Sequence, residues 1–438
     1  MSTIFIKNVN ILTMNKDKDV VEKGVVVIKD EKIIDVGNKE LLELYSPDII
    51  IDGEDGILMP GMVNTHTHVS MIPFRSLGDD VPDRLKKYIF PLEKMLVDKE
   101  LVRVGAQYGI AEMLLAGVTT FVDMYYFEDE VAKVAKQFGI RGVLGETIIN
   151  FVAPDGKEPY EGLEYSKWFI EKWKEDPLII PGVAPHAPYT NDTIHLQKAM
   201  DLAKKYDVPM IMHVAEMEYE YRQYKEQYDL TPVQYLDHIG VLNKNLIAAH
   251  LVHVSDEDLE LLKKKEVGIA HNIGANAKGA KGVCPAAKMY HKDMRIGLGT
   301  DGPMSGNTLD IITQMGLVGK IHKLFNKDRS LLPASEIVEM ATIGGAKAIH
   351  LEKEIGSIEV GKKADLVIIE TQSINMQPIY DYYATLVYSA NMSNVDTVMV
   401  DGKILVENKK LKHVNVMEIT EDLKKIQDRI VKATKKLL

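Results

Sequence analysis

The sequence has 438 residues, of which 46% are hydrophobic and 27% are charged, which is typical of a folded globular protein. The formal net charge is −11 and no basic face is evident, which argues against a protein that binds nucleic acid phosphates. The single cysteine, Cys284, excludes an internal disulfide and a cysteine-based zinc site. The sequence shows no signal peptide and no apolar run of roughly 18 residues, so we expect a cytoplasmic protein without a membrane partner.

The first 57 residues carry short β-branched runs, which predict strands at residues 4–6, 25–28 and 32–36. Turn-forming residues separate such runs, and we expect turns at Asp30-Glu31 and at Asp52-Gly53. This part of the chain is therefore predicted to be all-β.

Between residues 58 and 355, short apolar runs alternate with stretches typical of amphipathic helices. The eight runs are 61–66, 118–123, 141–146, 179–184, 209–213, 246–250, 267–270 and 295–299, and helices are expected at 195–206 and 256–265, among others. Apolarity along a whole run fits a strand that is buried on both faces. The alternation predicts a parallel (β/α)8 barrel, the TIM barrel.

From residue 356 onward the β character returns, with strands predicted at 364–369 and 395–405 and a turn at Asp401-Gly402. An amphipathic helix is expected from Met417 to the end. We expect both chain ends, residues 1–57 and 356–438, to build one small β-sandwich domain beside the barrel of residues 58–355.

Polar residues lie at the carboxyl ends of the predicted barrel strands, which is where barrel active sites lie. These residues are His66 and His68, Asp123, Glu146, His186, His213, His250, His271 or Asn272, and Asp301. Residues i and i+2 of a strand share a face, so His66 and His68 can bind the same ion. Alone they are a weak motif, and the number of polar strand ends is what indicates a site.

With His213 and Asp301, the two histidines form a donor set that suits one divalent ion, zinc first, with iron or manganese as alternatives. Such an ion lowers the pKa of a bound water, and Glu216, His250 and Asp301 could then transfer protons during hydrolysis of a C–N bond. Two other interpretations stay open: His250 as a core histidine, and Asp301 as the cap of the next helix.

Six segments carry a family resemblance: residues 58–68, 184–189, 213–216, 248–250, 299–302 and 356–366. In this order they resemble the amidohydrolase superfamily. The most similar branch contains the S-adenosylhomocysteine, 5′-methylthioadenosine and adenosine deaminases, which also resemble the triazine chlorohydrolases. The resemblance runs nearly from end to end.

The resemblance implies that His66, His68, His213 and Asp301 bind the metal and that a metal-bound hydroxide expels ammonia from the substrate. It implies that Glu216 protonates a ring nitrogen and that His250 orients the reacting centre. Two substrate contacts are also implied, from His186 to the purine ring and from Glu93 to the ribose hydroxyls. For Glu93, a solvated helix carboxylate is the alternative.

Departures from the family bear on the substrate. Glu146 stands near the third strand end, where the family has an arginine that meets the carboxylate of adenosylhomocysteine, and Arg84 stands where the family has a tryptophan. Residues 271–276 differ as well. We therefore predict a neutral or cationic aminopurine nucleoside as substrate, such as adenosine, 5′-deoxyadenosine or 5′-methylthioadenosine. Arg84 and Glu146 are candidate substrate contacts, and adenosylhomocysteine is expected to be a poorer substrate.

Other hydrolases of the superfamily are alternatives, namely a guanine or pterin deaminase, a chlorohydrolase or a cyclic amidase. Cyclic amidases often bridge two metals with a carboxylated lysine, and no lysine ends the fourth run. A non-catalytic scaffold protein is a remote alternative, because every predicted metal ligand is present. We expect the partner to be a small molecule, and a homo-oligomer stays open by analogy with the family.

Overall fold

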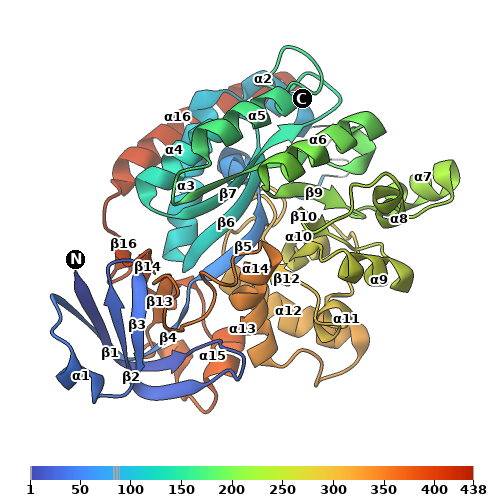
Figure 1. The fold of residues 1–438 in the computed structure, drawn as a ribbon. Helices are drawn as coiled ribbons and strands as arrows, with labels where there is room; N and C mark the ends of the chain where they lie inside the picture. Colours follow the sequence, from blue (N-terminus) through green and yellow to red (C-terminus); the bar gives the residue numbers. More distant parts are fainter. Residues whose placement is uncertain (1, 82–83, 85–86, 88, 438) are drawn as a thin grey trace.

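The computed structural model describes residues 2–81, 84, 87 and 89–437, and the strands of this part form two eight-stranded sheets (Figure 1). One sheet is parallel and is surrounded by helices. The other lies at one side and is built from the two chain ends. Over the described residues, none of the helices combines the length and the apolarity required to cross a bilayer.

The parallel sheet is the predicted barrel, with neighbouring strands paired in sequence order from β5 to β12. Its strands are β5 Met62–Thr67, β6 Val118–Tyr125, β7 Arg141–Ile148, β8 Ile179–Pro185, β9 Met210–Val214, β10 Leu246–His250, β11 Gly268–His271 and β12 Ile296–Leu298. The barrel closes where Thr300 N and Asp301 N donate to His66 O, at 3.2 and 3.0 Å. Each strand lies on one of the eight predicted runs, so the predicted (β/α)8 barrel is confirmed.

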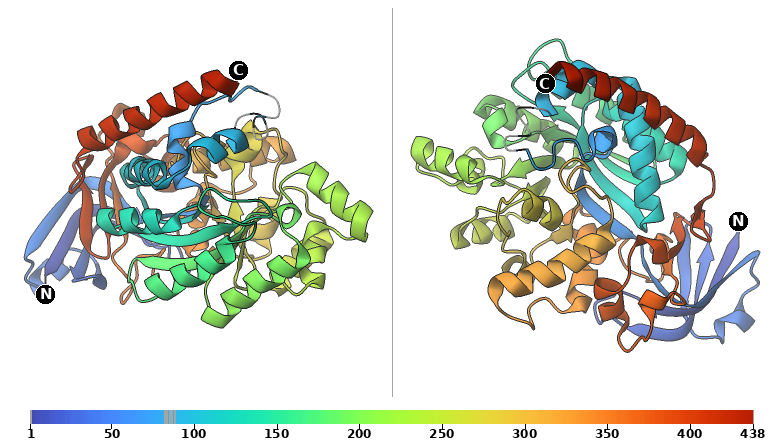
Figure 2. Two further views of the ribbon diagram at one scale, coloured as in Figure 1. Left: turned by 90° about the horizontal axis from the view of Figure 1, so that it is seen from above. Right: turned by 180° about the vertical axis from the view of Figure 1, so that it is seen from behind.

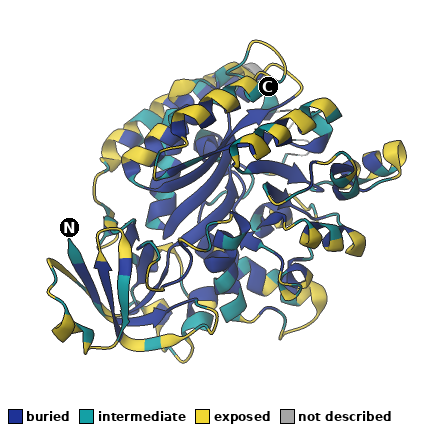
Figure 3. Ribbon diagram, viewed as in Figure 1, coloured by how far each residue is buried: buried dark blue, intermediate teal, exposed yellow. Residues whose placement is uncertain are grey.

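Helices cover the outside of the barrel, with their exposed faces turned to solvent and the strands buried beneath them (Figure 3). Those between and after the strands are α2 Phe90–Leu96, α3 Lys99–Leu115, α4 Glu128–Phe138, α5 Gly162–Trp173, α6 Thr193–Tyr206, α7 Glu218–Tyr228, α8 Pro232–His238, α9 Asp256–Lys264, α10 Ile273–Lys278, α11 Ala286–His291, α12 Ile311–Asn326, α13 Ala334–Ala341 and α14 Ile343–Ala348. The predicted helices at 195–206 and 256–265 are α6 and α9. Each begins after a capping side chain, Asp192 and Ser255, that accepts a hydrogen bond from a backbone N–H of the first turn.

The second sheet has the strand order β16-β15-β14-β13-β4-β1-β2-β3. Its strands are β1 Thr3–Leu12, β2 Val20–Lys29, β3 Lys32–Gly37, β4 Ile49–Pro60, β13 Leu366–Ile369, β14 Val395–Val400, β15 Lys403–Glu407 and β16 Lys410–Leu411. The N-terminal and C-terminal parts meet where β4 pairs antiparallel with β13. Both chain ends therefore build one unit, as expected, but its described strands form one continuous sheet where a β-sandwich of two sheets was predicted. The division of the chain after residues 57 and 355 stays a prediction. Strand β4 extends to Pro60, beyond the predicted boundary at residue 57.

The expected turn at Asp52-Gly53 is wrong, because both residues lie inside β4. Glu54 and Asp55 adopt left-handed backbone angles, with φ of 50° and 58°, and the register of β4 against β1 shifts at this point. The turn-forming residues thus form a bulge within the strand, and the strand continues to Pro60.

Two features join the smaller unit to the barrel. Arg141, at the start of β7, lies 2.6 Å from Asp401 and 3.3 Å from Asp365, measured from its Nη2 to a carboxylate oxygen of each, and all three side chains are largely buried. The terminal helix α16 Val416–Leu437, predicted from Met417, packs against α2 and α3 (Figure 2). Its Arg429 lies 2.6 Å from Asp98.

Candidate metal centre

Four side chains predicted as metal ligands converge at the carboxyl end of the barrel. His66 lies on β5 and His68 directly after it, while His213 lies on β9 and Asp301 follows β12. His68 Nε2 is 3.4 Å from Asp301 Oδ1 and 3.2 Å from His213 Nε2, and His66 Nε2 is 3.8 Å from Asp301 Oδ1. Strands far apart in the sequence thus deliver the four side chains to one point.

His250, at the end of β10, belongs to the same cluster. One ligand atom from each of His66, His213, His250 and Asp301 lies within 4.8 Å of the others. His250 and Asp301 both have left-handed backbone angles, with φ of 78° and 59°. Strained backbone of this kind collects at functional sites.

Hydrogen bonds fix the tautomers of three histidines. His68 Nδ1 lies 2.6 Å from Met124 O, and His213 Nδ1 lies 2.6 Å from His186 O. Because a carbonyl only accepts, Nδ1 of each ring carries the proton and the lone pair of Nε2 faces the centre. His250 Nδ1 lies 2.8 Å from Asn276 Oδ1, which directs its Nε2 to the centre in the same way.

Unpartnered buried atoms show that the cluster is built for a ligand. Both ring nitrogens of His66 and Nε2 of His250 are buried without a hydrogen-bond partner among the described residues. Burial lowers the pKa of His66 well below its ordinary value, so the ring is neutral and can donate a lone pair. Burial favours the neutral form of Asp301, but His250 and Lys281 outweigh this effect and hold the pKa of its carboxyl low. This donor set fits a single divalent metal ion.

Two alternative interpretations of these residues fail. His250 is not a satisfied core histidine, because its Nε2 lies 3.7 Å from Glu216 Oε1 and 3.9 Å from Asp301 Oδ2 without a hydrogen bond. Asp301 does not cap the next helix of the described chain, because α12 begins at Ile311 and its N-terminal cap is Asp310.

Glu216 lies beside the cluster, in the loop after β9. Its backbone N–H and that of Ala215 both donate to the buried carboxyl group of Glu220, each at 3.0 Å, which fixes the loop. The Oε1 atom of Glu216 contacts Nζ of Lys281. Burial raises the pKa of the Glu216 carboxyl, yet His250 and Lys281 together hold it below its usual range. A carboxylate is thus placed next to the predicted metal.

Asn276 and Lys281 are site residues that the sequence reasoning missed. Asn276 ends the segment 271–276, whose difference from the family pattern does not by itself indicate a contact with His250. Lys281 is a lone lysine in a loop, and no spacing or motif distinguishes it from the many surface lysines.

Of the predicted substrate contacts, His186 lies against the cluster and Glu93 is connected to it through Tyr125, whose ring centroid lies 6.4 Å from that of His68. The ring centroid of His186 is 4.8 Å from that of His213. Glu93 lies on α2 and is only 7% exposed, so the interpretation as a solvated helix carboxylate is wrong. Tyr125 donates its hydroxyl to Glu93 Oε1 at 2.7 Å, and burial, opposed by this hydrogen bond, raises the pKa of Glu93 to about 7. Glu93 also lines a cavity of about 550 Å³.

The structure does not bring Arg84 or Glu146 into the cluster. Arg84 pairs with Asp79 and donates to Met304 O at 2.7 Å, while its neighbours 82, 83 and 85 lie outside the described residues. Glu146 is fully buried and accepts from Glu128 N, at the start of α4, at 3.0 Å. Its placement against α4 argues against a contact with a substrate at the centre.

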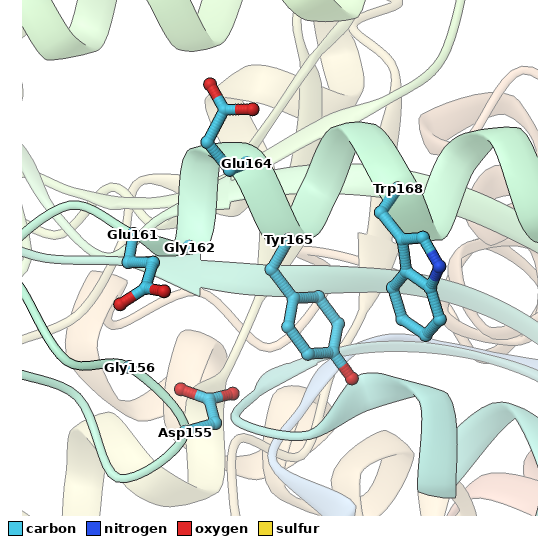
Figure 4. A pocket seen from close by; sticks show the side chains of 7 residues that line it. All are labelled: Asp155, Gly156, Glu161, Gly162, Glu164, Tyr165 and Trp168. Carbon is cyan, nitrogen blue, oxygen red and sulfur yellow. The ribbon is translucent and has the colours of Figure 1, made fainter.

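Burial is the main cause that raises the pKa of Glu146 well above its ordinary value, and the negative charge of Asp155 raises it further. Asp155 lines a separate pocket of about 220 Å³ with Tyr165 and Trp168 of α5 (Figure 4). Glu146 is therefore part of the buried barrel wall.

Comparisons with known proteins agree with this architecture. Residues 57–405 match the model of the amidohydrolase family. The chain is 38% identical over 424 residues to the 5-methylthioadenosine/S-adenosylhomocysteine deaminase of Thermodesulfovibrio yellowstonii, covering 96% of this chain and 97% of that protein.

Two solved structures share the fold. One is an adenosine deaminase from Xanthomonas campestris with bound zinc, which is 31% identical with a TM-score of 0.96 and covers 98% of each chain. The other is the zinc complex of atrazine chlorohydrolase from Arthrobacter aurescens, which is 21% identical with a TM-score of 0.90 and covers 97% of this chain and 100% of that one. The chain belongs to the amidohydrolase family.

Proposed function

We propose that this amidohydrolase is a zinc-dependent hydrolytic deaminase that releases ammonia from an aminopurine nucleoside. The observation that carries the proposal is the convergence of His66, His213, His250 and Asp301 beside the carboxylate of Glu216. Nitrogen and carboxylate donors suit zinc, and the relatives named above are a deaminase of 5-methylthioadenosine and S-adenosylhomocysteine and an adenosine deaminase with bound zinc.

His66, His68, His213 and Asp301 would hold the ion. When bound, a divalent ion supplies Lewis-acid activation of water. The carboxylate of Glu216 would take a proton from the water and give it to a ring nitrogen of the substrate. His250 would orient the reacting centre, because its Nδ1 is held by Asn276 and its Nε2 faces inward. Water adds to the ring carbon that carries the amino group, and the added hydroxyl gives its remaining proton to that group. The C–N bond then breaks to release ammonia and leaves a carbonyl on the ring.

Glu93 and its cavity support a preference for nucleosides with an uncharged 5′ group. Glu93 would accept hydrogen bonds from the ribose hydroxyls, and the cavity beside it would bind the 5′ substituent. The cavity is lined by Phe90, Glu93, Lys94, Tyr126, Phe151, Val152, Ala153 and Pro154. Burial of the charged amino acid tail of adenosylhomocysteine against these mostly apolar walls would be costly. Adenosine, 5′-deoxyadenosine and 5′-methylthioadenosine are therefore the proposed substrates.

An ammonia-release assay of the zinc-loaded protein tests this function. We expect the three neutral nucleosides to have kcat/KM values at least about tenfold above that of adenosylhomocysteine, which corresponds to about 1.4 kcal/mol. Glu216→Gln should abolish release, whereas Glu218→Gln, a matched change at an exposed carboxylate of the same segment, should not. Release from guanine or pterin alone would replace the substrate class. Chloride from a chlorotriazine, a ring-opened acid, or no product at all would overturn the deaminase proposal.

A further inference from the structure

Lys281 occupies a buried position beside the proposed catalytic carboxylate. It lies in the loop that follows α10, and its side chain is only 14% exposed. Its Nζ contacts Glu216 Oε1 and lies 4.0 Å from Asp301 Oδ2. We propose that Lys281 is a positioning residue that holds Glu216 in the orientation needed for proton transfer. This inference rests on the proposed deaminase function.

The loop is shaped to deliver this side chain. Lys281 N donates to Asn276 O at 3.0 Å, which anchors the backbone. A Cβ at Gly279 would lie 2.8 Å from Cε and 3.2 Å from Cγ of Lys281, so the glycine leaves the space that the lysine stem fills. Asn276 also holds His250. The helix α10 and the loop that follows it thus hold two of the groups proposed to act on the substrate.

The contact with Lys281 gives the two carboxylate oxygens of Glu216 different roles. Oε1 meets Lys281 and faces His250 Nε2 at 3.7 Å, while Oε2 has no hydrogen-bond partner among the described residues. Because Oε1 is held, the plane of the carboxylate is set and Oε2 is left to meet the ring nitrogen. A neutral side chain at position 281 would let the carboxylate rotate away from the position that proton transfer requires.

Steady-state kinetics of zinc-loaded Lys281→Met and Lys281→Arg test this role. We expect Lys281→Met to lower kcat with the best nucleoside about 10- to 100-fold, with KM changed by less than about threefold, because orientation rather than binding is lost. Lys281→Arg keeps a cation and should recover most of kcat. Lys288→Met removes an exposed lysine paired with Asp256 and should leave both constants unchanged.

A double-mutant cycle identifies the residue through which Lys281 acts. In a Glu216→Gln background, Lys281→Met should cause no further fall, because its effect passes through the carboxylate. Multiplying effects, or an unchanged kcat in the single variant, would overturn the proposal. A variant that no longer retains its metal would overturn it as well, because Lys281 would then act on Asp301.

Crystal structures of the wild type and of Lys281→Met provide a readout that does not depend on activity. We expect Glu216 Oε1 on Lys281 in the wild type and a rotated or multiply oriented carboxylate in the variant. An unchanged Glu216 in the variant refutes the positioning role. If the wild type releases no ammonia from any nucleoside, the proposed function fails, and the two structures still decide whether Lys281 orients Glu216.

Discussion

Replacement of Glu93 by glutamine is expected to remove a pH dependence from nucleoside recognition. Glu93 is buried on α2 beside the proposed substrate cavity and accepts a hydrogen bond from the Tyr125 hydroxyl at 2.7 Å. Burial, opposed by this hydrogen bond, raises its pKa to about 7. The carboxyl is therefore about 10% ionised at pH 6 and about 90% ionised at pH 8.

The magnitude follows from the ionised fraction. If the carboxylate accepts the ribose hydroxyls, kcat/KM for adenosine should fall about tenfold for each unit below pH 7. Glutamine can keep the hydrogen bond from Tyr125 through its amide oxygen but does not ionise, so the profile of the variant should be flat in this range. At pH 8 the variant loses charge-assisted hydrogen bonds, which are worth about 1.5–3 kcal/mol each, and kcat/KM should fall about 10- to 100-fold.

The same pKa makes an opposite prediction for stability. The folded state raises the pKa of Glu93 from 4.5 to about 7, so it binds this proton more tightly than the unfolded chain does. The stabilisation is complete below pH 4.5 and is lost as the pH rises through about 7, a change of about 3 kcal/mol. Glu93→Gln carries no ionisable group, so above pH 7 it should unfold at a higher denaturant concentration than the wild type.

Initial rates of ammonia release from about pH 5.5 to about pH 8.5 test the first effect. Free adenine, which lacks the ribose, is the matched control, and its profile should be the same for the wild type and Glu93→Gln. The reasoning is refuted if adenosine and adenine share one profile in the wild type, or if the glutamine variant keeps the wild-type slope with adenosine.

Three further changes probe the centre and the fold. Asp301→Asn should lower metal affinity about a hundredfold, and full metal content after dialysis would show that Asp301 is not a ligand. Asn276→Ala removes the acceptor for His250 Nδ1 and should lower kcat about tenfold with metal content unchanged. Asn276→Asp keeps an acceptor and should have a higher kcat than Asn276→Ala, and equal kcat values for the two variants would contradict this role. Arg141→Met leaves Asp365 as an unpaired buried charge and should cost about 3–5 kcal/mol in chemical denaturation, far more than Lys133→Met at the surface.

The barrel was predictable because its signal is local and repeated. Strands buried on both faces must be apolar throughout, and such runs are visible wherever they occur. The same logic located His66, His213 and Asp301, because parallel strands place their carboxyl ends at one edge and polar residues there stand out against apolar runs. The family resemblance then supplied an expectation for Glu93, whose burial on α2 no local pattern indicated.

The errors and omissions have a common cause in long-range context. Asp52-Gly53 has the composition of a turn, yet pairing of β4 with β1 on both sides of it keeps it inside a strand. Glu146 ends an apolar run like the other polar residues, but its side chain packs against α4 rather than facing the centre. Lys281 depends on the path of an irregular loop, which carries no periodicity that a sequence pattern could reveal.

These contacts separate what the barrel fixes from what a loop fixes. His68 and His213 are oriented by the carbonyls of Met124 and His186, which belong to the neighbouring strand β6 and to the end of β8. Backbone carbonyls survive side-chain substitution, so the proposed ligand geometry is a property of strand register. His250 and Glu216 are instead oriented by Asn276 of α10 and by Lys281 of the loop that follows it. Changes in that loop can therefore alter the groups proposed to act on the substrate while the metal centre stays intact. We therefore expect substitutions in this segment to change the substrate preference or the rate of the enzyme without loss of the metal.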